Sequence, residues 1–302
     1  MSAPADSLKS ILYALAANFA IAVAKTSGAI YTGSASMLAE AIHSFADCAN
    51  QALLLWGLKE ADRAPTADHP LGYGKAIYFW SFIVALMLFS MGGLFSIYEG
   101  MHKISGTDPV QSPWVAIAIL SFGIVAEGIS LWGCVREINK VRGKKSLWAW
   151  FKTSRQSELV VILGEDIAAL GGLALALGFI GISMVTGNPV WDALGSIAIG
   201  ALLLVVAFLI GAQVKGLLLG QSAEPEMLAQ MKKHLTEAPE VIELYNLLTQ
   251  QLGNEIMVAI KARMQPQGSE VALIDAINRV EAGFRGAFPQ VRWIFFEPDV
   301  AD

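Results

Sequence analysis

The sequence predicts an α-helical membrane protein in which six transmembrane helices are followed by a soluble α+β domain. Hydrophobic residues make up 55% of the 302 positions and charged residues 16%, whereas soluble domains average about 25% charged residues. The charge is also unevenly divided, because residues 221–302 contain 12 acidic and 7 basic residues and residues 1–220 contain 14 of each. This division predicts a membrane domain over residues 1–220 and a soluble domain over residues 221–302.

Six stretches of the first domain are apolar and long enough to cross a bilayer, for which about 20 residues are needed. They run over residues 8–30, 37–58, 76–98, 113–135, 158–185 and 190–211. Polar or basic segments separate them, as expected for membrane helices joined by loops. We therefore expect a multi-pass integral membrane protein.

Basic residues in the loops predict the orientation, because short cytoplasmic loops are enriched in Lys and Arg. The connection between the fourth and fifth stretches contains Arg136, Lys140, Arg142, Lys144, Lys145, Lys152 and Arg155. The turns at residues 32–36 and 187–189 contain no basic residue. We expect both termini on the cytoplasmic side and no cleavable signal peptide at the N-terminus.

The soluble part has the pattern of a small mixed domain. Apolar spacing predicts a helix near residues 228–235, paired strands over 241–251 and 255–264, a second helix over 271–280 and a last strand over 291–296. The order α-β-β-α-β is typical of a small sheet packed on helices.

Two groups of ionisable side chains lie at membrane depth, where such groups usually mark the path of a substrate. His43 and Asp47 are four residues apart, so on a helix they share one face, and imidazole with carboxylate suits a divalent first-row metal. A hydrogen-bonded His/Asp pair without metal is the alternative. Glu40 and Asn50 lie on the same stripe, where their side chains can bind the metal directly, contact its ligands, form an entry site or line a cavity as solvated residues. The second group is Glu165-Asp166 in the fifth stretch.

These motifs resemble the cation diffusion facilitator family of divalent-metal/proton antiporters. The resemblance rests on six spans, on His43-x-x-x-Asp47 in the second span and on the segment from His69 to Lys75 before the third. It implies a homodimer of six-helix units with a cytoplasmic ferredoxin-like domain, and an ion held between spans two and five. It also implies a transporter rather than an enzyme, here expected in a bacterial inner membrane.

The fifth span departs from the family pattern. Relatives place His-x-x-x-Asp there, whereas this chain has Ile162 and Asp166, so one ligand is missing. A zinc-transporter-like branch has the same Glu-Asp pair, which makes Glu165 the candidate substitute, with a structural or proton-carrying role as its alternative. The expected metal ligands are therefore His43, Asp47, Glu165 and Asp166. Zinc is the expected cargo, exchanged for protons, and cobalt, iron(II), manganese or cadmium are admissible.

Other polar residues carry weaker signals. Glu127 in the fourth span is expected in an interhelical contact rather than in ion carriage, and Asp192 as a helix cap or interface residue. Asp68 and His69 can form a second metal site, although a turn is the favoured interpretation. His234 is the one histidine of residues 221–302, which contain no cysteine, so we expect this domain to dimerise by packing without zinc.

Two other classes of function fit the same residues. In a membrane scaffold or regulator without transport, the buried acids only hold helices together. A proton-coupled carrier of an organic cation is the second alternative, although no aromatic cage accompanies the acids. The expected partners are membrane lipid and a second copy of the chain, with no nucleic acid.

Overall fold

The computed structural model describes residues 4–104 and 112–301, with side chains from Asn18 onward. The chain forms two compact units. The first comprises Met1–Trp56, Trp80–Lys144 and Glu158–Gln213, and the second comprises Gly57–Phe79, Lys145–Ser157 and Val214–Asp302. The described part of the first unit is helical, and the second contains a three-stranded sheet.

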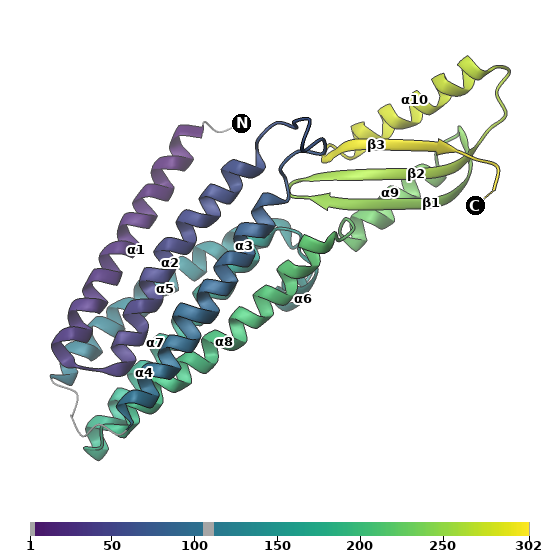
Figure 1. Ribbon diagram of the computed structural model, residues 1–302. Coiled ribbons are helices and arrows are strands. Elements are labelled where there is room, and N and C mark those ends of the chain that lie inside the picture. Colours follow the sequence, from purple (N-terminus) through teal and green to yellow (C-terminus); the bar gives the residue numbers. More distant parts are fainter. Residues whose placement is uncertain (1–3, 105–111, 302) are drawn as a thin grey trace. The chain divides into compact units, whose positions relative to one another are not determined.

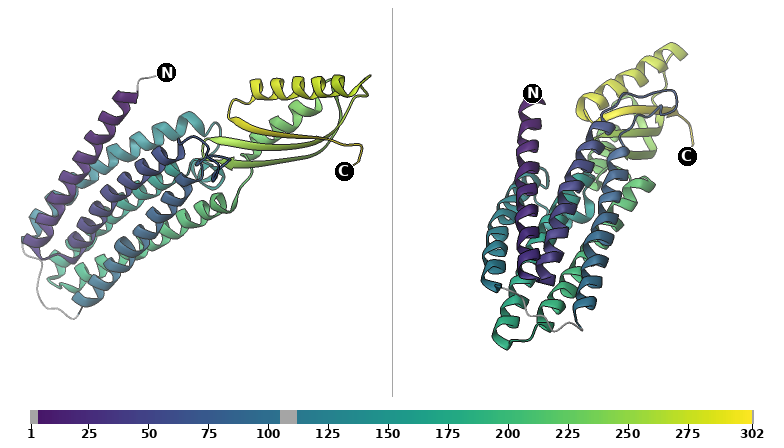
Figure 2. Two further views of the ribbon diagram at one scale, coloured as in Figure 1. Left: turned by 45° about the horizontal axis from the view of Figure 1, so that its top comes forward. Right: turned by 60° about the vertical axis from the view of Figure 1, so that its left-hand side comes forward.

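Long helices run side by side in the first unit (Figures 1 and 2). They are α1 (Pro4–Thr32), α2 (Ala35–Ala61), α5 (Pro113–Val141), α7 (Ser157–Thr186), α8 (Val190–Leu219) and a composite helix of α3 (Ala76–Met87), the π-helical segment η1 (Leu88–Leu94) and α4 (Phe95–Lys103). All are longer than the stretches predicted from hydropathy, because their polar ends continue the helix beyond the apolar part.

Within the described residues, four helices are apolar and long enough to cross a membrane. They are Ala76–Lys103, Pro113–Val141, Ser157–Thr186 and Val190–Leu219. Helix α2 falls outside this group because His43, Asp47, Asn50 and Gln51 make its middle polar. The side chains of the first half of α1 lie outside the described residues. Four helices of spanning length and composition are thus shown among the described residues, and the count of six spans stays a prediction.

Small residues bring the composite helix close to α8. A Cβ atom added at Gly200 would lie 2.6 Å from the carbonyl oxygen of Gly93, closer than real side chains approach. Nearby, Ser196 Oγ donates a hydrogen bond of 2.7 Å to the carbonyl oxygen of Ser96. Close packing and interhelical hydrogen bonds of this kind hold membrane helices together. These contacts therefore hold α8 against the composite helix.

Asp192 of α8 caps the N-terminus of α2. Its carboxylate accepts hydrogen bonds from Ser34 Oγ at 2.7 Å, from the Ala35 backbone N–H at 2.6 Å and from the Ser36 backbone N–H at 3.3 Å. The first N–H groups of a helix have no partner within the helix, and a carboxylate there also opposes the helix dipole. The prediction of a cap or interface residue is confirmed. The contact fixes the start of the helix that carries His43 and Asp47.

The soluble part has the predicted order of elements. It consists of α9 (Pro225–Thr236), β1 (Val241–Leu252), β2 (Glu255–Met264), α10 (Glu270–Ala287) and β3 (Val291–Pro298). The second unit also contains a short helix, α6 (Leu147–Thr153), which comes before α7 in the sequence. Strand β2 is central, pairing antiparallel with β1 and parallel with β3. The parallel pair requires a crossover connection, which α10 supplies.

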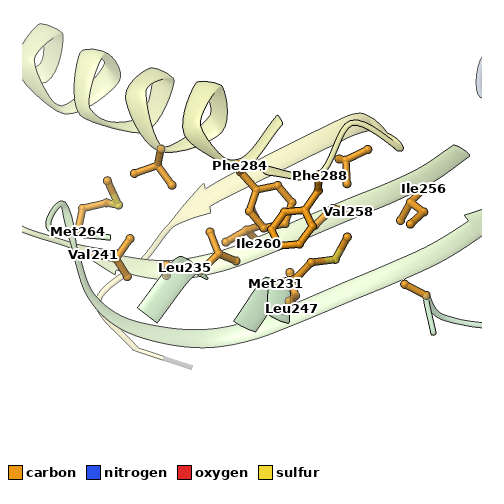
Figure 3. Packing of buried hydrophobic residues seen from close by; sticks show 14 of the residues in the cluster. Met231, Leu235, Val241, Leu247, Ile256, Val258, Ile260, Met264, Phe284 and Phe288 are labelled. Carbon is orange, nitrogen blue, oxygen red and sulfur yellow. The ribbon is translucent and has the colours of Figure 1, made fainter. Parts of the chain in front are cut away.

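Alternate residues of β2 form the floor of this domain's core. Its buried positions are Ile256, Val258, Ile260, Ala262 and Met264, all on one face of the strand. Residues of α9 and α10 pack into the same cluster, so both helices cover one face of the sheet (Figure 3). The rings of Phe284 and Phe288 lie together in this core, with centroids 4.8 Å apart.

The turn between β1 and β2 packs against the start of α3 within the second unit. Tyr78 Oη accepts a hydrogen bond of 3.0 Å from the backbone N–H of Gly253. A Cβ atom at Gly74 would lie 2.2 Å from the carbonyl oxygen of Leu252. Gly253 has a φ of +66°, which favours glycine. Two glycines thus allow the backbones to meet without intervening side chains.

Truncation of the core ring tests the packing of the soluble domain. We expect Phe284→Ala to lower the free energy of unfolding by about 3 to 5 kcal/mol, because the ring is fully buried. Urea unfolding of the fragment 221–302, prepared with a chelator, measures the effect. Ile274→Ala on the same helix is the control, because that side chain is exposed, and it should change stability by less than about 0.5 kcal/mol. Equal effects of the two variants would contradict the described core.

Removal of the cap tests how α2 is held. We expect Asp192→Ala to cost about 1 to 2 kcal/mol, which lowers the melting temperature of the detergent-solubilised protein by about 2 to 8 °C. Asp68→Ala removes an exposed carboxylate from a loop and serves as the matched control. A melting temperature of the Asp192→Ala protein equal to that of the control would show that the cap adds nothing.

Candidate metal site in the helical bundle

A small cavity lies among the helices of the first unit. Its lining residues come from α1, α2, α5 and α7 and are Asn18, Ser44, Asp47, Gln51, Glu127, Ile162, Glu165, Asp166 and Ala169. The space open to the centre of a water-sized sphere is about 20 Å³, enough for about one water molecule or ion. Four of the lining residues are acidic, which is unusual at this depth of an apolar bundle.

Helical spacing brings these side chains to one place. Asp47 and Gln51 are one turn apart on α2, and Ile162, Asp166 and Ala169 follow one stripe of α7. The cavity therefore lies where a polar stripe of α2 meets the face of α7 that carries Asp166, with α5 contributing Glu127 from a third direction.

The adjacent acids of α7 have different partners. Glu165 Oε1 accepts a hydrogen bond of 2.5 Å from Asn50 Nδ2 of α2. Asp166 Oδ1 accepts one of 3.1 Å from Ser130 Oγ of α5. Successive residues of a helix point about 100° apart, so the two carboxylates link α7 to two neighbouring helices while both border the cavity.

His43 and Asp47 face one another on α2. The distance from His43 Nδ1 to Asp47 Oδ1 is 3.5 Å, and the imidazole is fully buried, whereas the Asp47 side chain is 14% exposed. His43 is absent from the lining of the cavity that Asp47 borders. Among the residues with described side chains, no group of three or more His, Cys, Asp and Glu residues is arranged to hold one ion. The structure thus brings Asp47, Glu165 and Asp166 to one cavity, and His43 lies next to Asp47 without lining that cavity.

Several buried polar atoms around the cavity have no hydrogen-bond partner. Of nine such side-chain atoms in the described part of the chain, six belong to this region: Glu40 Oε1, His43 Nδ1 and Nε2, Asp47 Oδ1, Asn50 Oδ1 and Asp166 Oδ2. Buried polar groups without partners are rare, and their concentration in one place points to an ion or water. Nitrogen and oxygen donors of these types fit zinc and similar cations.

A buried ion pair lies beside the cavity, and the sequence did not predict it. Lys25 Nζ of α1 is 3.3 Å from Glu40 Oε2 of α2 and donates a hydrogen bond of 2.8 Å to Ser44 Oγ. Both charged side chains are fully buried. The available signal was Lys25 within the first apolar stretch and a lone glutamate near the start of the second. Glu40 is therefore engaged by Lys25 rather than free to line the cavity.

Glu127 was expected in an interhelical contact rather than in ion carriage, and the structure places it on the cavity wall. Asp68 and His69 lie in an exposed turn, in which the backbones of Thr66 and His69 exchange hydrogen bonds of 3.2 and 3.1 Å. The His69 ring stacks on Tyr73 with centroids 4.4 Å apart. The turn interpretation of this segment is confirmed.

The remaining candidate ligands, His234, Cys48 and Cys134, are packed among other side chains and do not line the cavity. The rings of Phe284 and Phe288 contact His234 edge to face, at centroid distances of 5.9 and 5.7 Å. Cys48 and Cys134 are free and buried.

Comparison with known proteins agrees with the motifs. The sequence matches the cation efflux transmembrane domain family over residues 11–219. It is 36% identical to a mitochondrial proton-coupled zinc antiporter of Xenopus laevis over 80% of this chain and 44% of that protein. A metal tolerance protein of Arabidopsis thaliana is 31% identical over 82% of this chain and 54% of its own length.

A bacterial relative is covered more fully. The zinc transporter ZitB of Pectobacterium atrosepticum is 25% identical over 89% of this chain and 80% of that protein. By contrast, the match to the animal and plant relatives spans about half of their length. With two thirds of its residues matched by the family's transmembrane domain, the chain belongs to the cation diffusion facilitator family of membrane transporters.

Proposed function

We propose that the chain carries a divalent metal ion, zinc in the first place, out of the cytoplasm in exchange for protons. The observation that carries this proposal is the group of unpartnered nitrogen and oxygen atoms around a buried cavity. Relatives named as zinc transporters and as a proton-coupled zinc antiporter support zinc as the cargo and protons as the counter-ion. In this proposal the ligands are His43, Asp47, Glu165 and Asp166.

The His43–Asp47 spacing suits a shared ion. Zinc bonds to nitrogen and oxygen ligands are about 2.0 to 2.2 Å long, so two ligands of a tetrahedral site lie about 3.4 Å apart. Nδ1 of His43 and Oδ1 of Asp47 are separated by 3.5 Å, and neither has another partner. Rotation of the Asp166 and Glu165 side chains toward this pair completes four ligands. For Glu165, this exchanges the Asn50 hydrogen bond for a bond to the metal.

Exchange with protons follows from the same donor atoms. Carboxylates and imidazole bind zinc only when they are deprotonated, so metal arrival releases protons and protonation expels the metal. Glu127 faces the same cavity and can accept a proton without binding the ion. Competition between the two kinds of cation at one cavity, combined with access from alternate sides, suffices for antiport.

The proposal includes the organisation of the protein. Six spans within residues 1–220 form the transport domain, and residues 221–302 form a cytoplasmic, ferredoxin-like domain through which two copies pair. Both termini face the cytoplasm. A bacterial inner membrane is the proposed location, supported by the bacterial zinc transporter, although the animal relative is named as mitochondrial.

The other two classes of function fit less well. A scaffold would need the buried polar groups to satisfy one another, yet six atoms near the cavity have no partner. An organic cation needs more room than about 20 Å³ and usually an aromatic wall. The lining contains no aromatic side chain among the described residues. A bare metal ion matches both the size and the donors.

Loss of a charged ligand tests the proposed function. We expect Asp47→Ala and Asp166→Ala each to reduce zinc uptake into inside-out proteoliposomes by at least about 100-fold, because each removes a metal-binding carboxylate from a site with few ligands. Uptake is measured with an internal zinc dye under an imposed proton gradient. Glu137→Ala is the control, because it removes an exposed carboxylate of α5. Wild-type uptake by either site variant would place the ion elsewhere.

The role of Glu165 is tested separately. We expect Glu165→Gln to weaken zinc binding about 10-fold or more, because an amide binds zinc poorly and does not ionise. Ile162→His restores the family's histidine in the fifth span and should recover part of the affinity of the Glu165→Gln protein. Calorimetric titration of the purified proteins with zinc gives the affinities. Unchanged affinity in the Glu165→Gln protein would leave Glu165 as a structural partner of Asn50.

A further inference from the structure

The Lys25–Glu40 ion pair fills the space between four helices. Its two members come from α1 and α2, and both are fully buried. On the α5 side, a Cβ atom at Gly123 would lie 3.3 Å from Lys25 Cε, and on the α7 side, a Cβ atom at Gly172 would lie 2.1 Å from Glu40 Oε1. Two glycines thus leave room for the pair in the middle of the bundle, and the pair occupies it.

The pair lies immediately beyond one end of the cavity. Ser44, which accepts the hydrogen bond from Lys25, lines the cavity together with Asp47. Glu40 is one turn closer than Ser44 to the start of α2. On α7, Ala169 lines the cavity and Gly172 is the next residue along the same stripe. An ion that moves from the cavity toward the start of α2 therefore meets Lys25 and Glu40 first.

We propose that Lys25 and Glu40 form the gate that closes the transport path on the side where α2 begins. The proposal rests on the transport function proposed above and adds two residues that bind no metal in it. The Lys25 ammonium group blocks the path sterically and repels a divalent cation. Release of the ion on that side requires Lys25 to separate from Glu40.

The surroundings of the pair suit a gate. A buried ion pair is costly to separate, because each charge is then left without a partner away from water. The closed state is therefore strongly favoured while the pair is dry. Glu40 Oε1 has no hydrogen-bond partner, so this carboxylate has a free oxygen for the ion once Lys25 has moved away. The two states differ by one interaction, which sets how often the path opens.

Accessibility of the cavity from each side tests the gate. Ala169→Cys, in a protein with Cys48→Ala and Cys134→Ala, places one thiol on the cavity wall next to the gate. A membrane-impermeant thiosulfonate is applied to one face of proteoliposomes at a time, and the labelled fraction is followed by mass spectrometry. With the pair intact, labelling is expected only from the face where α2 ends.

Loss of the charges should open the other side. In the reporter protein, Lys25→Met with Glu40→Gln keeps most of the side-chain volume, and replacement of both members of a buried pair is tolerated better than loss of one. We expect labelling from the face where α2 begins to become at least about 10-fold faster, because opening no longer separates two buried charges. Lys25→Ala with Glu40→Ala should act in the same direction and also removes the steric block.

A matched control separates gating from general loosening. Ser34→Ala with Asp192→Asn disrupts a buried polar contact at the same end of α2, between α2 and α8 and away from the cavity. This variant should lose thermal stability without faster labelling. The gate is overturned if the folded Lys25/Glu40 variants label like the parent protein, or if the control labels as fast as they do.

The labelling experiment is independent of the cargo. It uses no metal, so its result stands even if wild-type proteoliposomes fail to take up zinc, which would overturn the proposed function alone. Conversely, zinc uptake by the wild type together with unchanged labelling of the Lys25/Glu40 variants would overturn the gate alone.

Discussion

The cost of placing charges among apolar helices governs this structure. Water is scarce at that depth, so each charged group needs a partner from the protein. Lys25 and Glu40 satisfy one another across α1 and α2, Asp192 binds the free N–H groups at the start of α2, and Glu165 accepts a hydrogen bond from Asn50. These contacts decide which helices stand next to one another. The cavity lies where such pairing is incomplete.

Glycine makes this arrangement of partners possible. The buried ion pair needs a lysine and a glutamate to lie between four helices, and Gly123 and Gly172 provide the space. The approach of η1 to α8 uses Gly93 and Gly200 in the same way. In a membrane the hydrophobic effect does not drive helices together, so close packing and polar contacts carry the association. Small residues therefore allow the close helix packing in which buried charges reach their partners.

Much of the fold was predictable because it depends on local spacing. The helical stretches and the order α-β-β-α-β follow from patterns along a single segment. The pairing of Lys25 with Glu40 and the position of Glu127 on the cavity wall depend on how each helix is rotated toward its neighbours, which spacing along one helix does not specify. For the same reason, the shared face of His43 and Asp47 was predictable, but not that Asp47 alone borders the cavity.

Helix α2 connects these features in a fixed order. Asp192 holds its first turn, the contact with Lys25 follows at Glu40 and Ser44, and Asp47 then faces the cavity. Along the helix, the satisfied cap at its start thus gives way to side chains with unpartnered atoms from Glu40 onward. A helix fixed at one end can rotate or tilt at the other more easily than it can shift as a whole. Because the cap limits movement of the start of α2, a change of access at that end is expected to come from separation of Lys25 from Glu40 rather than from a shift of α2.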